Sequence, residues 1–330
     1  MSRKILAPFS LFLLVVVGFQ AAFAQELSRS TESALDSLKK MADAPRRHNY
    51  SGIFIYYADD HIETSRIFHK TGPAGEFEKI EVLDGSPRIV FRDNEEIQCY
   101  LLESKRIFTE KRWLRKFFPD LLPLPLDNVD ENYAIRELGS EKIAGRECQV
   151  LALIPKDSLR YGQKFWVDAE TGVPVKAAVV NGNQIIEQFA FAQLEIGGEI
   201  DPSQLKPDQT LITDGWKTTN LLTSILNEDE LHWQINSLPA GFRKLIEMKR
   251  NLAEKTGLVD HIALSDGVAT ISVFIELISK DEPSPIPGFF TGRGAINIYV
   301  RALDSHKITT IGEVPLETIK LIGDSVVKKN

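Results

Sequence analysis

The stretch YSGIFIYYADDHIETSRIFHKTGPAGEFEKIEVLDG, residues 50–85, decides the fold class. It contains three runs rich in aromatic and β-branched residues, separated by the short turn groups Asp59-Asp60 and Gly72-Pro73. Strand-forming residues in such runs predict β-strands, and turns this short favour antiparallel pairing of neighbours. The stretch therefore predicts an antiparallel sheet.

The same pattern continues on both sides of this stretch. Most runs alternate apolar and polar residues, which indicates a sheet with one dry face and one wet face. The expected strands are Tyr50–Tyr57, His61–Lys70, Glu76–Leu83, Arg88–Arg92, Glu96–Leu102, Tyr133–Leu138, Arg146–Pro155, Lys164–Asp168, Val173–Asn181 and Gln184–Leu194. One amphipathic helix is expected before them, with its apolar face formed by Leu27, Ala34, Leu35, Leu38 and Met41.

A single helix of this size, about 22 Å long, is too short to cover ten strands. We therefore expect the sheet to curve into a half-barrel around an incompletely filled apolar hollow, which has the character of a lipid site. Between Ile107 and Asp130 the alternation breaks, and residues 117–126 read FFPDLLPLPL. Its three prolines exclude a regular strand or helix. This loop is either a plug folded over the mouth of the barrel or a mobile lid that exposes apolar surface.

A second domain is expected in the C-terminal part of the chain. Residues 201–214 are polar and contain Pro202 and Pro207, so we place a linker there, between a large domain at 25–200 and a small domain at 215–330. A long surface loop is expected at Ser279–Gly294, and Pro315 opens a final helix carrying Leu316, Ile319, Ile322 and Val326. The strands expected here are Trp233–Leu238, Phe242–Lys249, Asp260–Ala263, Val268–Leu277, Ala295–Arg301 and Ile308–Ile311. The whole is thus α+β and mostly antiparallel, with a small sheet backed by one helix.

The N-terminus has the pattern of a secretory signal peptide. Arg3 and Lys4 precede an apolar run, and Ala22-Phe23-Ala24 predicts cleavage after residue 24. The apolar run is too short to span a membrane as an anchor and is interrupted by Pro8 and Ser10. No cysteine that could carry a lipid follows the cleavage site. In an oxidising compartment the only two cysteines, Cys99 and Cys148, are either a disulfide or two partly buried thiols, and the sequence leaves both open.

Composition and motifs favour binding over catalysis. The net charge is -7 with no basic block, so nothing points to nucleic acid. The chain has no nucleophile elbow, phosphate-binding glycine loop or zinc-protease motif, and its six histidines are scattered, so we expect no cofactor and no metal. A hydrolase that uses two distant carboxylates stays formally open.

Several segments resemble the family of the sigma-E factor regulatory protein RseB, also called MucB. In the second domain these are HWQINSLPAGF from His232, SDGVATISVFIE from Ser265, GAINIYVR from Gly294 and HKITTIGEVP from His306. In the first domain they are YSGIFIYY from Tyr50, VLDGSPR from Val82, IAGRECQV from Ile143 and WVDAETGVPVK from Trp166, in the same order as in the family. The resemblance covers essentially the whole chain after residue 24.

The resemblance implies a large domain like the lipoprotein carriers LolA and LolB, followed by a small domain that binds a partner. It implies a periplasmic protein that binds the periplasmic segment of a membrane-anchored anti-sigma factor of the RseA or MucA kind. Bound there, it would shield that segment from site-one proteolysis and repress the envelope-stress sigma factor until lipopolysaccharide or acyl chains release it. We expect acyl chains near Ile53, Ile55, Phe117, Phe118, Leu121 and Leu122. A lipid or lipoprotein carrier is the alternative, and homo-oligomerisation stays open.

Overall fold

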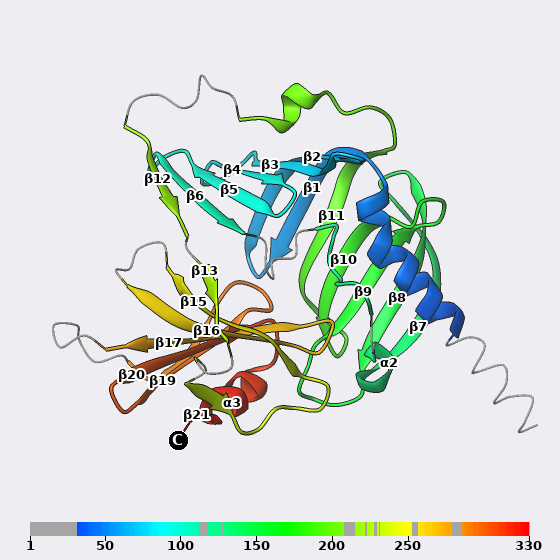
Figure 1. Cartoon of the computed structure of the whole chain (residues 1–330). Coiled ribbons are helices and arrows are strands. Elements are labelled where there is room, and N and C mark those ends of the chain that lie inside the picture. Colours follow the sequence, from blue (N-terminus) through cyan, green and yellow to red (C-terminus); the bar gives the residue numbers. More distant parts are fainter. Residues whose placement is uncertain are drawn as a thin grey trace, which may run out of the picture.

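A computed structural model of the chain describes residues 32–329, apart from 112–117, 127, 208–214, 222, 228–229, 231, 253–256 and 279–285. The signal peptide expected at residues 1–24 and Phe117, which we expected to bind lipid, lie outside the described residues. The chain forms a large curved sheet and a smaller sheet below it, with few helices (Figure 1). The α+β, mostly antiparallel fold class expected from the sequence is confirmed.

The large sheet has twelve strands in the order β12-β6-β5-β4-β3-β2-β1-β11-β10-β9-β8-β7. All ten expected strands are present with ends within a few residues of those predicted. Irregularities in the pairing of β1, β7, β9 and β10 with their neighbours bend the sheet, as β-bulges do. The strands are β1 Tyr50–Ala58, β2 His61–Gly72, β3 Gly75–Val82, β4 Arg88–Asp93, β5 Glu96–Leu101, β6 Arg106–Lys111, β7 Tyr133–Ile143, β8 Arg146–Pro155, β9 Gly162–Asp168, β10 Pro174–Asn181, β11 Gln184–Ile196 and β12 Lys217–Asn220.

Two strands of this sheet differ from the sequence-based expectation. β6 occupies the start of the segment that we expected to be irregular from Ile107 onwards. β12 lies beyond the expected linker but pairs in parallel with β6 and so extends the large sheet. The connector between β11 and β12 contains a short 3-10 helix, η1, Pro202–Leu205, which lies against β2 and β3 (Figure 1).

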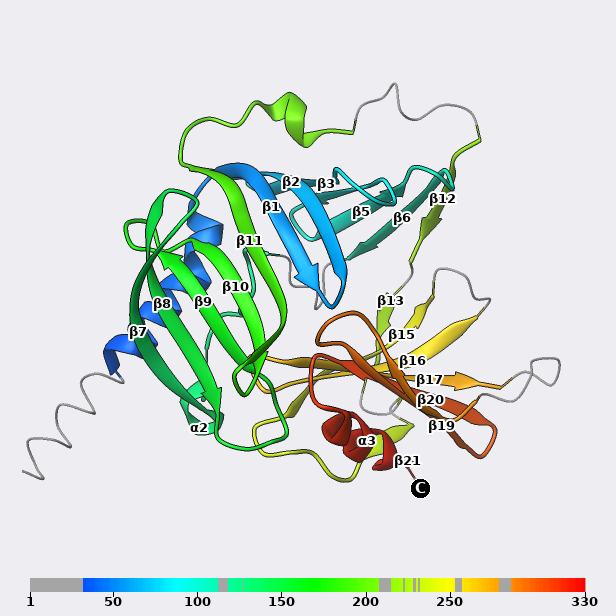
Figure 2. The ribbon, with the colours of Figure 1, turned by 180° about the vertical axis from the view of Figure 1, so that it is seen from behind.

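The N-terminal helix, described over residues 32–47, lies against the β7–β10 part of the large sheet (Figures 1 and 2). Ala34, Leu38 and Met41 are buried, while Asp36 and Lys39 are exposed, so the amphipathic helix predicted from the sequence is confirmed over its described part. It continues beyond Met41 to residue 47.

The small domain is a seven-stranded antiparallel sheet in the order β13-β15-β16-β17-β20-β19-β18, with helix α3, Leu316–Asp324, packed beside β19 and β20 (Figure 2). Val326 belongs to β21 instead of the final helix, because the helix ends at Asp324. Part of the expected surface loop, Gly288–Thr291, is strand β18. The other strands are β13 Thr223–Ile225, β14 Trp233–Ile235, which pairs with β21 Val326–Lys328, β15 Arg243–Asn251, β16 Leu258–Ser265, β17 Thr270–Leu277, β19 Asn297–Leu303 and β20 His306–Gly312.

In the part of the chain that the structure describes, no helix has both the length and the apolar character of a membrane span.

Candidate functional site

A cavity of about 310 Å³ lies inside the curve of the large sheet, where the small domain approaches it. Its floor includes a row of residues that face one another across five strands. The row runs through Phe165 of β9, Ala177 of β10, Phe189 of β11, Tyr56 of β1 and Glu63 of β2. Because Ala177 stands between two phenylalanines, its small side chain leaves space in the row. The hollow is therefore partly a consequence of side-chain size at one position.

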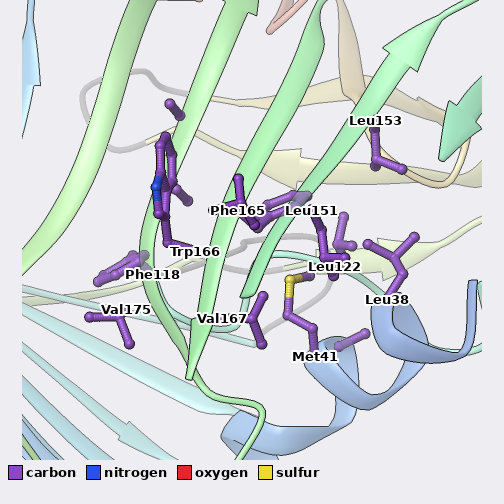
Figure 3. Packing of buried hydrophobic residues seen from close by; sticks show 14 of the residues in the cluster. Leu38, Met41, Phe118, Leu122, Leu151, Leu153, Phe165, Trp166, Val167 and Val175 are labelled. Carbon is purple, nitrogen blue, oxygen red and sulfur yellow. The ribbon is translucent and has the colours of Figure 1, made fainter. Parts of the chain in front are cut away.

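The loop that follows residue 117 packs over this floor. The Phe118 ring stacks on Phe189 with ring centroids 5.6 Å apart and lies 5.5 Å from Phe54. Leu121 and Leu122 line the cavity, and Phe118 and Leu122 are each 3% exposed (Figure 3). Asp120 accepts a hydrogen bond from the Arg46 guanidinium at 3.1 Å, which ties the loop to the end of the N-terminal helix. In this structure the loop is thus a plug, one of the two alternatives left by the sequence.

Ile53 and Ile55 do not line the cavity, contrary to the expectation from the sequence. Successive side chains of a strand point to opposite faces, and in β1 it is Phe54 and Tyr56 that face the hollow. Ile55 lies on the other face and is 37% exposed. The run YSGIFIYY is apolar on both faces, so the sequence alone offers no basis for choosing the inward set.

The end of the cavity nearest the small domain is charged. Glu63 and Arg88 form an ion pair at 2.6 Å within the large domain, while Arg293 and Glu313 come from the small domain. Glu187 of β11 lies between the domains: its Oε2 accepts hydrogen bonds from the Tyr56 hydroxyl at 3.2 Å and from the backbone N–H of Ala295 at 3.1 Å. Burial, reinforced by the Glu313 carboxylate, raises the pKa of Glu187 from 4.5 to about 7.

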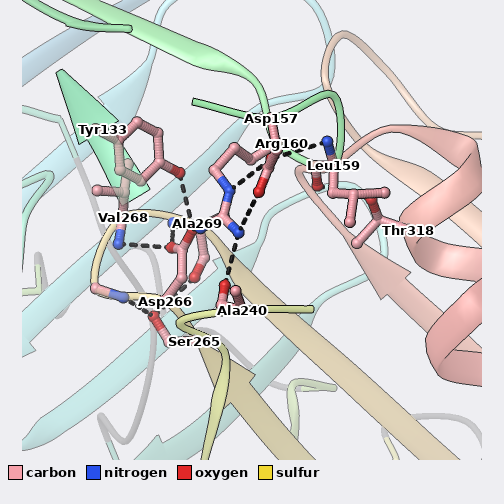
Figure 4. Close-up of polar contacts among 11 residues, drawn as sticks. Tyr133, Asp157, Leu159, Arg160, Ala240, Ser265, Asp266, Val268, Ala269 and Thr318 are labelled. Carbon is pink, nitrogen blue, oxygen red and sulfur yellow. Dashed lines mark hydrogen bonds and ion pairs between the residues drawn. The ribbon is translucent and has the colours of Figure 1, made fainter. Parts of the chain in front are cut away.

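A buried ion pair fixes the two domains to each other beside the cavity (Figure 4). Arg160, in the β8–β9 turn, donates to Asp266 Oδ2 at 2.8 Å, and neither side chain is exposed to solvent. Tyr133 also donates to Asp266 Oδ2 at 2.8 Å, and Arg160 donates to the Ala240 carbonyl oxygen at 2.7 Å. Burial and the Asp266 carboxylate raise the pKa of Tyr133, so this hydroxyl keeps its proton.

Asp266 lies in the turn between β16 and β17, and this turn also places an apolar side chain in the large domain. Asp266 Oδ1 accepts hydrogen bonds from the backbone N–H groups of Val268 and Ala269 at 2.9 and 2.8 Å, which shapes the turn. Val268 is 4% exposed, belongs to the hydrophobic core of the large domain and lines the cavity. One wall of the cavity is therefore supplied by the small domain, which sequence analysis did not foresee.

Cys99 and Cys148, for which the sequence left a disulfide open, are not bonded to each other in the structure. Cys99 is in β5 and Cys148 in β8, and seven strands lie between them in the sheet. Among the described residues, no group of three or more His, Cys, Asp or Glu side chains is arranged to hold a metal ion.

Comparison with known proteins identifies the family. Residues 33–209 match the model of the MucB/RseB N-terminal domain, and residues 227–327 match that of the MucB/RseB C-terminal domain. The chain belongs to the MucB/RseB family. This confirms the family resemblance found in the sequence, in both halves of the chain.

Relatives within the MucB/RseB family are similar over nearly the full chain. The sigma factor AlgU regulatory protein MucB of Pseudomonas aeruginosa is 28% identical over 306 residues, which are 89% of this chain and 90% of the relative. The sigma-E factor regulatory protein RseB of Haemophilus influenzae is 25% identical over 332 residues, 98% of this chain and 99% of the relative. The solved complex of Pseudomonas aeruginosa MucA and MucB contains a chain that superposes with a TM-score of 0.69 at 25% identity, covering 90% of this chain and 99% of that one.

Proposed function

We propose that this protein is a periplasmic binding protein that holds the periplasmic segment of a membrane-anchored anti-sigma factor of the RseA or MucA kind. While bound, it shields that segment from site-one proteolysis and so represses a sigma-E-type envelope stress response. The observation that carries the proposal is that both domains match the family, and that the chain superposes over 90% of its length on a protein solved together with MucA.

The small domain, in this proposal, provides the surface for the anti-sigma factor, and the cavity of the large domain senses lipid. The cavity is mostly apolar along its floor and is partly closed by Leu121 and Leu122, which suits an acyl chain. At about 310 Å³ it is near the lower limit of ligand pockets, so a lipid with several chains must displace the plug or the small domain.

A ligand shifts an equilibrium only through different affinities for its two states. Val268 forms part of the cavity wall, so a lipid that fills the cavity competes directly with the docked position of the small domain. Release of the anti-sigma factor by lipopolysaccharide or stray acyl chains follows if the partner prefers the docked arrangement.

The test is co-purification of the full chain with the periplasmic segment of such an anti-sigma factor, scored by protection of the segment from the site-one protease. Addition of purified lipopolysaccharide should abolish protection by the wild type. Phe118→Asp and Leu122→Asp should change the lipid response, whereas Leu124→Asp, on the same loop but already 37% exposed, should leave it unchanged. No protection by the wild type would contradict the proposal, and an unchanged lipid response in the first two variants would contradict the placement of the lipid.

A lipid or lipoprotein carrier is the second candidate, and the same cavity favours it. A carrier would move lipid between vesicles in a transfer assay without any anti-sigma segment. The small domain argues for regulation instead, because a simple carrier does not need a second domain built into the wall of its cavity.

A further inference from the structure

The contact between β11 and the turn before β19 joins the two domains through a buried carboxyl group. Glu187 is 6% exposed, and its Oε2 accepts the N–H of Ala295, a residue of the small domain. The neighbouring N–H, that of Gly294, is donated to Asp59 Oδ2 at 3.1 Å. Two consecutive amides of the small domain therefore dock on two carboxylates of the large domain.

Gly294 is required for this close approach. A Cβ atom built at this position would lie 2.2 Å from Glu187 Oε2, and the residue has a φ of +62°, which favours glycine. The turn is therefore shaped to bring its backbone against the carboxyl group of Glu187.

Negative charge exceeds positive charge at this contact. Glu187 and Asp59 of the large domain face Glu313 of the small domain, and Tyr56 donates its hydroxyl to Glu187. Arg88 and Arg293 are the arginines that line this cavity, and Arg88 is paired with Glu63 at 2.6 Å. Glu63 also lies 4.0 Å from His61. Because Arg293 is exposed and Glu187 is buried, a negative charge on Glu187 is poorly compensated.

We propose that Glu187 is a proton-controlled latch between the two domains. When it is neutral, its carbonyl oxygen still accepts the Ala295 N–H and the domains stay docked. When it is ionised, its buried charge lies close to Glu313 across the junction, and the docked arrangement is weakened. The latch acts without partner or lipid, so its failure would be distinguishable from failure of the proposed function.

The direction of the effect follows from the raised pKa. Glu187 binds a proton more tightly in the docked state, with a pKa of about 7, than in an open state with the ordinary value of 4.5. Docking is therefore strongest at low pH and is lost progressively as the pH rises toward about 7, by up to about tenfold in the docking equilibrium per pH unit.

Hydrogen exchange of the Gly294 and Ala295 amides in the full chain tests the latch. The exchange rate of each amide in the wild type is divided by its exchange rate in Glu187→Gln at the same pH. This ratio removes the intrinsic pH dependence of amide hydrogen exchange. The ratio should increase from pH 5 to pH 7, by up to about tenfold per unit. Glu81→Gln, which lies outside the cavity and is paired with Arg66 and Lys79 within the large domain, should behave as the wild type.

Glu313→Gln provides a second, independent variant. It removes the negative charge of Glu313, which raises the pKa of Glu187, and leaves Glu187 itself unchanged. The loss of docking with rising pH should therefore occur at lower pH than in the wild type. A wild-type ratio that is the same at both pH values, or an equal effect of Glu81→Gln and Glu187→Gln, would overturn the proposal.

Discussion

Asp266, in the turn between β16 and β17 of the small domain, accepts a hydrogen bond at 2.8 Å from Arg160 in the β8–β9 turn of the large domain. Both side chains are wholly buried. The Arg160 guanidinium also lies over the rings of Tyr133 and Phe242, at 5.5 and 5.4 Å from their centroids. Arg160 also donates two hydrogen bonds to Asp157 of its own turn, each at 3.0 Å, so it joins the large domain to Asp266, Ala240 and Phe242 of the small domain.

Removing one member of this pair should be costly. Arg160→Ala leaves the Asp266 carboxylate buried without its ionic partner, and we expect the free energy of unfolding to fall by about 3–5 kcal/mol. Denaturant unfolding of the full chain measures this. Lys39→Ala, which removes an exposed ion pair with Asp36, is the control and should leave the midpoint nearly unchanged. A loss below about 1 kcal/mol in Arg160→Ala would show that the pair does not fasten the domains.

Filling the cavity should separate lipid binding from folding. Ala177→Leu adds three carbon atoms inside the hollow and should change the free energy of unfolding by less than about 1.5 kcal/mol, because space is available there. Binding of purified lipopolysaccharide, followed by calorimetry, should weaken. The matched control is Ala190→Leu, which adds the same atoms on the outer face, where Ala190 pairs with Ile55 and Lys176. Equal lipid affinity in both variants would place the lipid elsewhere.

The two thiols should differ in reactivity. Cys148 is wholly buried, and burial raises the pKa of its thiol to about 11, so little reactive thiolate forms near neutral pH. Cys99 is only partly buried. Alkylation of the native protein at pH 8, followed by mass spectrometry, should therefore modify Cys99 well before Cys148, and denaturant should make the two equal. A peptide pair linked through Cys99 and Cys148 would contradict the separation of β5 and β8 in the sheet.

The strands could be predicted from the sequence because a short run of aromatic and β-branched residues bounded by turn residues is a local signal. Residues Tyr50 to Ala58 form such a run, and β1 begins where expected. β6, with the sequence RIFTEK, was missed because it directly precedes the irregular segment that contains three prolines. β12 was missed because its pairing with β6 joins segments far apart in the sequence, which no local pattern records.

The candidate site was only partly predictable, for a related reason. Phe118, Leu121 and Leu122 could be found because apolar residues on a proline-rich loop must pack somewhere. The choice between Ile55 and Tyr56 depended on which face of β1 points inward, and both faces are apolar. The role of Glu187 could not be predicted from the sequence, because a glutamate in a strand is common and its contact with Ala295 exists only when the second domain packs against β11.

The most direct test of the account is the affinity of the full chain for the anti-sigma periplasmic segment, measured by calorimetry with and without purified lipopolysaccharide. Because coupling between two ligands is reciprocal, the affinity for lipopolysaccharide must also be measured with and without the segment. The account predicts that each ligand weakens the other by the same factor, at least about fivefold. Identical affinities in the presence and absence of the other ligand would contradict it.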